Sequence, residues 1–271
     1  MLATQVERED PRHALVAWIR EPDNPFFARA MVNRVWKQLL GRGMVEPEDD
    51  FRPTNPPSHP RLLDELAADF IRTGYDLRRL IRTIVTSRAY QRSSLPESGD
   101  EGDPKVVARY VVRRLPGPVL LDAVDRVTGV ESDFPAVPRG TRAVQLPDDG
   151  FETPGGFLRS FGPGTRSSDS TCEPVAVPDL GQSLYFLNGA ELQAKLANDS
   201  GRAARYARGD RADRVQIDEL YLVAYSRFPT DEERNVGLSL LARRRAEGRL
   251  RAGYEDLIWA ILNTPEFQYN H

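Results

Sequence analysis

The sequence is poor in the residue types that build covalent or metal-bound frameworks. Its 271 residues include one cysteine, Cys172, and three histidines. A single thiol excludes an intrachain disulfide and any zinc site made of several thiolates. Apolar runs also stay well short of the roughly 18 residues that a membrane-spanning helix needs, so we expect no transmembrane segment.

Lysine is scarce as well, occurring only at Lys37, Lys105 and Lys195, while every other basic side chain is an arginine. The net charge of -3 gives the chain no overall basic field for nucleic acid. Arginines gather within residues 202–214 and 243–251, but acidic residues surround them. We therefore predict solvated, ion-paired helix faces and no nucleic-acid partner.

Apolar residues recur at helical spacing within residues 27–39, 62–71 and 77–85, with polar residues on the opposite faces. Several local signals predict where helices begin and end. Four capping residues each precede a proline: Asp10, Asn24, Asp103 and Thr264. Thr230 and Glu233 form a capping box, and Gly41 and Gly74 follow apolar stripes, where helices should end.

We predict a mainly α fold, a multi-helix bundle with an irregular central excursion rich in glycine and proline over residues 129–178. Only VQL at 144–146 looks extended there. Interleaved aromatic residues favour an ordered, packed excursion: Phe134, Phe151, Phe157 and Phe161. We expect a single helical domain over 1–271, with an N-terminal helical part at 11–92, a linker at 93–104, helices and the irregular loop at 105–178, and a C-terminal helical part at 179–271.

A faint internal repeat relates IRTIVTSRAYQ at 81–91 to IWAILNTPEFQ at 258–268 without a gap. In both segments we expect an apolar helix to end, a short hydroxyl side chain to cap the next turn, and an aromatic residue to fold back. Two related helical halves are one explanation. Chance similarity between helical patterns is the other.

The loop GRGMVEPEDDFRPTNPPSHP, residues 41–60, is the strongest candidate site. It contains four carboxylates: Glu46, Glu48, Asp49 and Asp50. The last three could offer oxygen ligands to a hard cation, with His59 nearby as a base. The prolines favour a second interpretation, a clasp between two helices. In it Asp49 or Asp50 holds backbone N–H groups or pairs with Arg34, Arg42 or Arg52, and Ser58 caps the next helix. The carboxylates lack the ligand spacing of a calcium loop, and whether a metal binds is left open.

Residues 24–94, from NPFFARAMVNRVW to TSRAYQRSS, strongly resemble a bacterial family, the planctomycete PSD domain, which is a domain of unknown function numbered fifteen fifty-three. The resemblance continues through FLRSFGPGTR at 157–166, QSLYFLNG at 182–189, LYLVAYSRFPTDEE at 220–233 and LIWAILNTPEFQYNH at 257–271. Many relatives carry a Cys-x-Cys-Glu-Arg-like motif. Here Ser170 stands at its first cysteine and Pro174 at its arginine, so a disulfide or metal role for Cys172 does not carry over.

The family resemblance implies a place in large exported proteins, usually beside a companion domain of unknown function and often beside a cytochrome-c-like module. It therefore implies a periplasmic or cell-surface location, although the acidic N-terminus MLATQVEREDP carries no export signal. The chain has no Cys-x-x-Cys-His haem site, so any redox partner would lie elsewhere.

From this we predict an uncharacterised, non-catalytic binding or assembly module of an exported multidomain bacterial system, with no cofactor of its own. Its partners would be companion domains or proteins of that system, cytochrome-c-like ones among them, or a polysaccharide. The candidate binding residues are Arg34, Asp49, Asp50, Arg52, His59, Arg159, Arg166 and Cys172. The alternative is a hydrolase-type enzyme acting on surface polysaccharide through the carboxylates of residues 46–50.

Overall fold

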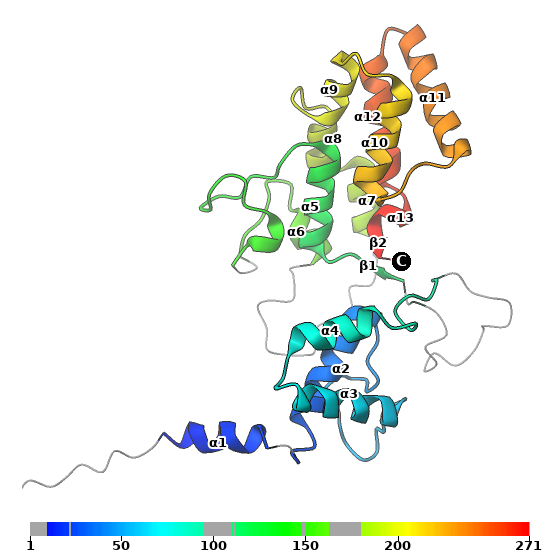
Figure 1. Ribbon diagram of the computed structural model, residues 1–271. Coiled ribbons are helices and arrows are strands. Elements are labelled where there is room, and N and C mark those ends of the chain that lie inside the picture. Colours follow the sequence, from blue (N-terminus) through cyan, green and yellow to red (C-terminus); the bar gives the residue numbers. More distant parts are fainter. Residues whose placement is uncertain are drawn as a thin grey trace, which may run out of the picture. The chain divides into compact units, whose positions relative to one another are not determined.

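The computed structural model describes residues 10–21, 23–94, 110, 112–147, 150–162 and 180–270. Helices dominate these residues, which confirms the mainly α, multi-helix prediction (Figure 1). The chain divides into two compact units, one reaching to Val112 and the other spanning Arg113–Asn270. Two compact units can belong to one domain or to two, so the single domain over 1–271 stays a prediction. The predicted linker at 93–104 lies almost wholly outside the described residues.

The first unit is built on three helices that pack on one another, α2 (Phe27–Leu40), α3 (Pro60–Arg72) and α4 (Leu77–Val85). They coincide with the three apolar stripes of the sequence, because each stripe supplies the buried face of one helix. Val32 and Leu63 are completely buried in their common core. A further helix, α1 (Pro11–Ile19), precedes them, and its described side chains are mostly exposed.

Local capping chemistry explains several helix ends. Asp10 caps α1 by accepting a hydrogen bond from the Arg12 amide at 3.0 Å, and Gly41 ends α2 with a φ of 80°. Asn24 does not cap α2 directly, since the helix begins at Phe27. Its Oδ1 instead accepts from the amides of Phe26 and Phe27 at 3.0 and 3.1 Å. Asp103 lies outside the described residues.

The second unit contains the remaining helices around one larger core. They are α5 (Gly117–Thr128), α6 (Phe157–Phe161), α7 (Leu180–Asn188), α8 (Ala190–Leu196), α9 (Arg202–Arg208), α10 (Asp213–Tyr225), α11 (Asp231–Ala246), α12 (Leu250–Leu262) and α13 (Pro265–Gln268). The ends of the unit meet in an antiparallel pair of short strands, β1 (Arg113–Arg114) and β2 (Tyr269–Asn270). This pairing closes the unit, because it joins the residues before α5 to those after α13.

The described part of the central excursion is ordered and packed, as the interleaved aromatics predicted. Phe134, Phe157 and Phe161 are buried in the core of the second unit, and Phe151 packs against it. The prediction of an extended segment at 144–146 was wrong, because residues Ala143–Gln145 form a 3₁₀ turn. Asp122 helps to hold this turn, because its carboxylate accepts hydrogen bonds from the amides of Ala143 and Val144 at 2.7 and 3.3 Å. Local sequence patterns do not predict a partner so far away in the chain.

Two buried cations hold the C-terminal end of α5. Lys195 donates to Asp125 at 2.7 Å and to the Val130 carbonyl at 3.2 Å. Arg202 donates to the carbonyls of Arg126 and Val127 at 3.0 and 2.8 Å. Helix C-termini carry partial negative charge and unpaired carbonyls, so these cations stabilise α5 where it needs donors.

The arginine-rich segments are extensively ion-paired, as predicted. Arg211 pairs with Glu219, Arg245 with Asp213, and Arg251 with Asp199. Arg202 departs from the predicted solvated face because it is only 9% exposed.

Arg227 joins three segments of the second unit. Its guanidinium donates to the carboxylate of Glu233 at 2.8 and 2.9 Å and to that of Glu266 at 2.7 Å for both bonds. It also lies over the rings of Tyr221 and Tyr225, 5.6 and 5.3 Å from their centroids. The hydrogen bonds from Arg227 are the main reason why the pKa of Glu233 is lowered to about 2. Glu233 also completes the predicted capping box with Thr230.

The two segments of the internal repeat have the same local structure. Ser87 Oγ donates to the Ile84 carbonyl at 2.6 Å and accepts from the Tyr90 amide at 3.4 Å. In the second segment Thr264 Oγ1 makes the corresponding bonds to the Ile261 carbonyl at 2.8 Å and from the Phe267 amide at 3.2 Å. The predicted cap and returning aromatic are confirmed locally, while common descent of the two halves stays a prediction.

Replacing Lys195 by methionine should lower the free energy of unfolding by about 3–5 kcal/mol, because Asp125 would keep a largely buried charge without its cation. Urea unfolding followed by circular dichroism measures this change. The matched control is Arg214→Met on α10, an exposed arginine to which the described residues give no ion pair, and it should change stability by less than about 0.5 kcal/mol. Equal effects of the two substitutions would contradict a structural role for the buried cation.

Replacing Arg227 by methionine should destabilise the chain by about 1–2 kcal/mol near pH 7, after allowing for solvent screening. The folded-state pKa of Glu233 is depressed, so its contribution is present above its ordinary pKa of about 4.3 and is lost as the pH falls towards 2. Unfolding free energies of wild type and variant should therefore converge across that window. A difference that stays constant from neutral pH to pH 2 would show that the ion pair is not its source.

Candidate functional site

The loop between α2 and α3 is organised around Asn33, a completely buried amide on α2. Its Nδ2 donates to the carbonyls of Val45 and Glu48 at 2.9 and 3.0 Å. Its Oδ1 accepts from the amides of Met44 and Val45 at 2.7 and 3.1 Å. One side chain thus supplies both donors and acceptors to a backbone segment that forms no regular structure of its own.

Gly43 is required where the loop turns beside Asn33. A Cβ atom at this position would stand 2.5 Å from the Val45 carbonyl oxygen and 3.0 Å from Asn33 Oδ1. Its amide donates to Glu46 Oε1 at 2.7 Å. The first carboxylate of the loop is therefore used inside the loop itself.

Lys37, on the next turn of α2, holds two carboxylates at once. Its Nζ donates to Glu46 at 3.2 Å and also pairs with Glu48. Burial is the largest single influence on the pKa of Glu48 and raises it. The hydrogen bond from Lys37, a backbone hydrogen bond and the positive charge of Lys37 together outweigh burial, so the net pKa lies below its ordinary value. Glu48 is thus held in its ionised form.

The other two carboxylates face arginines. Arg34 binds Asp49 through two hydrogen bonds of 3.1 and 2.7 Å. Arg52 binds Asp50 in the same forked manner, which lowers the pKa of Asp50. Asn55 also stabilises the loop, because its Nδ2 donates to the carbonyls of Glu46 and Asp50 at 3.1 and 2.9 Å.

His59 lies at the end of the loop and is half-buried. Its Nδ1 is 3.1 Å from Ser58 Oγ. The prediction that Ser58 caps α3 was wrong: the N-cap residue is His59, with no side-chain cap, and Pro60 opens the helix. Ser58 is drawn away because its amide donates to the Met44 carbonyl at 2.7 Å.

The candidate residues of the central excursion are only partly described. Arg159 is exposed on α6, and its amide donates to Glu152 Oε2 at 2.5 Å. Arg166 and Cys172 lie outside the described residues. The structure therefore brings Arg34, Asp49, Asp50, Arg52 and His59 into one loop region, and the binding role of all these residues stays a prediction.

A second polar cluster was not expected from the sequence. Glu191 Oε2 accepts hydrogen bonds from Thr153 Oγ1 at 2.8 Å and from the Tyr185 hydroxyl at 2.7 Å. Burial, and next the hydrogen bond to Glu191, raise the pKa of Tyr185, so this phenol stays protonated. Gly155 makes room for the cluster, since a Cβ there would stand 2.3 Å from Glu191 Oε2. Local sequence patterns do not predict this cluster, because its members lie up to 38 positions apart.

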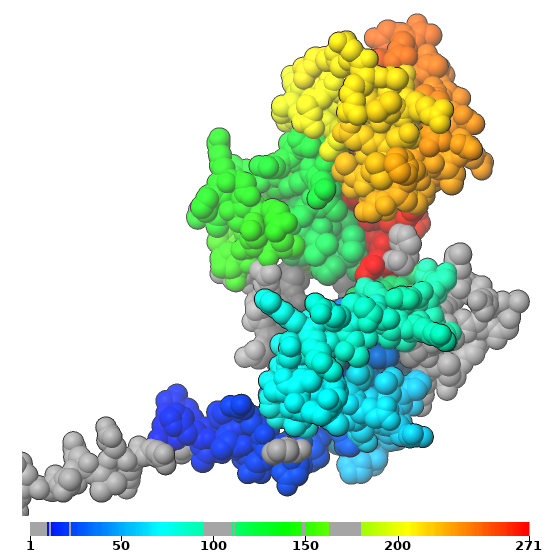
Figure 2. Space-filling view, viewed as in Figure 1, coloured from blue at the N-terminus to red at the C-terminus, as the bar shows by residue number. Residues whose placement is uncertain are grey.

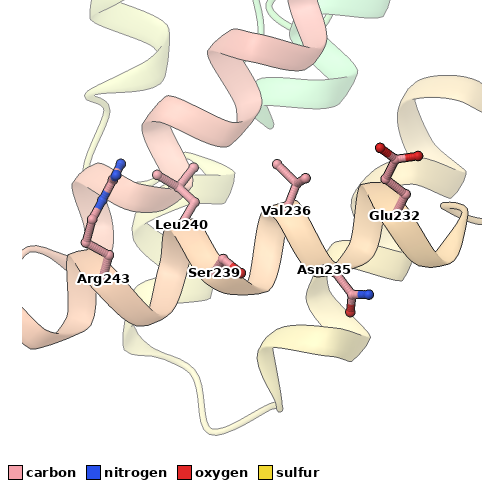
Figure 3. Close-up of a pocket in the computed structure, with 6 residues that line it drawn as sticks. All are labelled: Glu232, Asn235, Val236, Ser239, Leu240 and Arg243. Atoms are coloured by element: carbon pink, nitrogen blue, oxygen red, sulfur yellow. The ribbon is translucent and has the colours of Figure 1, made fainter.

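Two pockets among the described residues are open to solvent. One follows a single face of α11 and is lined by Glu232, Asn235, Val236, Ser239, Leu240 and Arg243 (Figure 3). Figure 3 shows these side chains projecting from that one helix, which provides no opposing wall. Another is lined by His13, Val16, Ala17, Arg20 and Tyr75. Neither is lined by the carboxylates of the 41–60 loop.

The described residues contain neither a cluster of metal-ligating side chains nor a membrane-spanning helix. Within the described ranges, histidine, cysteine, aspartate and glutamate side chains form no group of three or more that could hold a metal ion. The described helices likewise include none with the length and apolar character needed to cross a membrane.

The geometry defines a mainly helical protein whose charged loop is paired internally. A model of the PSD1 family, described as "Protein of unknown function (DUF1553)", matches residues 11–241. The chain belongs to this family, which confirms the resemblance seen in its sequence. Neither the curated proteins nor the solved structures include a match to the chain.

Replacing Asn33 by alanine should lower the free energy of unfolding by about 2–4 kcal/mol, because buried backbone groups of the loop would lose their hydrogen-bond partners. The control is Gln38→Ala, an exposed residue of the same helix, which should stay within about 0.5 kcal/mol of wild type. Urea titration of both variants gives the comparison. If Asn33→Ala behaves like Gln38→Ala, the loop does not depend on this amide.

Proposed function

We propose that the chain is a non-catalytic binding or assembly module of an exported multidomain bacterial system, working at the periplasm or cell surface. The family assignment is consistent with an uncharacterised module of this kind. The exported setting rests on the family resemblance of the sequence. The companion domains or proteins of the same system are its proposed partners.

The observation that supports the proposal is that the carboxylates of the 41–60 loop are bound by cations within the loop and α2. Each of them is held by a cation of its own unit, and Glu46 also accepts from a backbone amide. Such pairing stiffens a connection between two helices and leaves a shaped surface rather than a reactive group. Binding modules need that kind of fixed surface.

The hydrolase alternative requires different pKa values for these carboxylates. Glycoside hydrolysis needs one carboxylic acid with a raised pKa as proton donor and a second, ionised carboxylate beside it. The pKa values of Glu48 and Asp50 are instead lowered by Lys37 and Arg52. These shifts run against Glu48 or Asp50 as the general acid, which favours the binding module.

A thermal-shift series on the whole chain tests the proposal. Wild type should show no change in melting temperature with divalent cations, a chelator or a panel of surface glycans. The variant Asp49→Asn/Asp50→Asn/His59→Ala should melt a few degrees lower under every condition, because it loses two ion pairs of the loop. The control Asp23→Asn/Glu65→Gln removes two exposed carboxylates of the same unit and should melt like wild type.

Ligand linkage decides between the two functions. A cation or glycan that binds only the folded state must raise the melting temperature. A glycan-dependent rise in wild type that disappears in the triple variant, followed by release of reducing sugar, would establish the hydrolase and overturn the binding module.

A further inference from the structure

Helix α4 of the first unit has one buried face and one exposed apolar face. Leu80 and Ile84 are 4% and 1% exposed and pack into the core. Leu77 and Ile81, one helical turn apart on another side, are 43% and 41% exposed. Figure 2 shows the α4 segment, in cyan, at the surface of the first unit on the visible face.

The matching helix of the second unit indicates what this face is for. The gap-free match between residues 81–91 and 258–268 extends back through both helices and aligns Leu77 and Ile81 with Tyr254 and Ile258. Tyr254 and Ile258 are 0% and 1% exposed. The same helix face is thus buried in α12 and open in α4.

The inward faces of the two helices confirm that the alignment is in register. Leu80 and Ile84 align with Leu257 and Ile261, which are 7% and 3% exposed. All four residues are core residues of their units. The difference in exposure is therefore confined to the outer face.

In the second unit another helix contacts the outer face at Tyr254. Helix α9 packs on α12, and its residues Ala203, Ala204 and Tyr206 are buried. The ring of Tyr206 meets that of Tyr254 edge to face at 5.5 Å. A short neighbouring helix thus contributes to covering a face of this kind.

The cations beside the apolar stripe of α4 limit the chemistry of its partner. Arg79 pairs with Asp69 at 3.3 Å. Arg78 and Arg82 are exposed one turn apart, and no ion pair to either occurs in the part of the chain that the structure describes. On α4 an apolar stripe lies beside two such arginines. A partner helix complements it when its own apolar stripe lies beside carboxylates.

We propose that the outer face of α4 binds an acidic amphipathic helix of a partner protein. Leu77 and Ile81 would receive its apolar residues, and Arg78 and Arg82 would pair with glutamates or aspartates at its flank. This is the helix-to-helix mode of recognition, with anchors one turn apart. The inference rests on the proposed function and adds to it the binding surface and the class of partner.

The test uses the whole chain and two fluorescein-labelled helical peptides with identical apolar stripes of leucine and alanine. One carries glutamates beside the stripe and the other carries lysines at the same positions. Fluorescence anisotropy should show tighter binding of the glutamate peptide. The variants Arg78→Glu/Arg82→Glu and Leu77→Asp/Ile81→Asp should each weaken that binding by about tenfold or more.

Matched controls separate a lost surface from a lost fold. Arg61→Glu reverses an exposed charge on α3 of the same unit and should bind the glutamate peptide like wild type. Both α4 variants change exposed residues, so they should melt within a few degrees of wild type. Reversal of specificity in Arg78→Glu/Arg82→Glu, with the lysine peptide now bound more tightly, is the most direct expected result.

The remaining outcomes show which claim is wrong: the binding surface, the class of partner or the proposed function. Glutamate-peptide binding that survives both α4 variants would overturn this surface and leave the binding module in place. Dimerisation of the chain that Leu77→Asp/Ile81→Asp abolishes, or binding to phosphatidylglycerol vesicles without peptide binding, would overturn the partner class. The glycan-dependent hydrolysis described above would instead overturn the proposed function.

Discussion

The buried amide of Asn33 is the interaction on which the candidate site depends. A loop rich in proline and charge cannot hydrogen-bond its own backbone as a helix does, so one side chain from the preceding helix serves Met44, Val45 and Glu48. Once those backbone groups are fixed, Lys37 and Arg34 on the same helix stand opposite the loop carboxylates. The spacing of Asn33, Arg34 and Lys37 along α2 therefore sets the electrostatics of the loop.

Cations fulfil the same structural task in the second unit. Lys195 and Arg202 supply donors to the carbonyls at the end of α5, and Arg227 connects two carboxylates from segments that follow α10 and α12. The forked guanidinium suits such multiple bonds, since its donors are fixed in one plane. Part of the abundant arginine in the sequence thus forms hydrogen bonds and ion pairs inside the protein.

Much of the helical architecture could be predicted from the sequence, because apolar periodicity and capping are local. The stripes of residues 27–39, 62–71 and 77–85 became α2, α3 and α4, and Thr230 with Glu233 caps α11 as expected. The candidate loop was also recognisable from its carboxylates and prolines. The 3₁₀ turn at Ala143–Gln145 and the cluster around Glu191 were not, since each depends on a partner more than 20 positions away.

The sequence by itself determined the helices, several of their caps, the family and the charges available to the central and 41–60 loops. Only the tertiary structure decided which charges pair and which apolar faces are covered. Ile81 and Ile258 occupy equivalent positions in two similar segments, yet one is 41% exposed and the other 1%. Burial depends on the neighbouring helices that pack against a face. Helices α9 and α11 both pack on α12, and the periodicity of a single segment does not contain this packing.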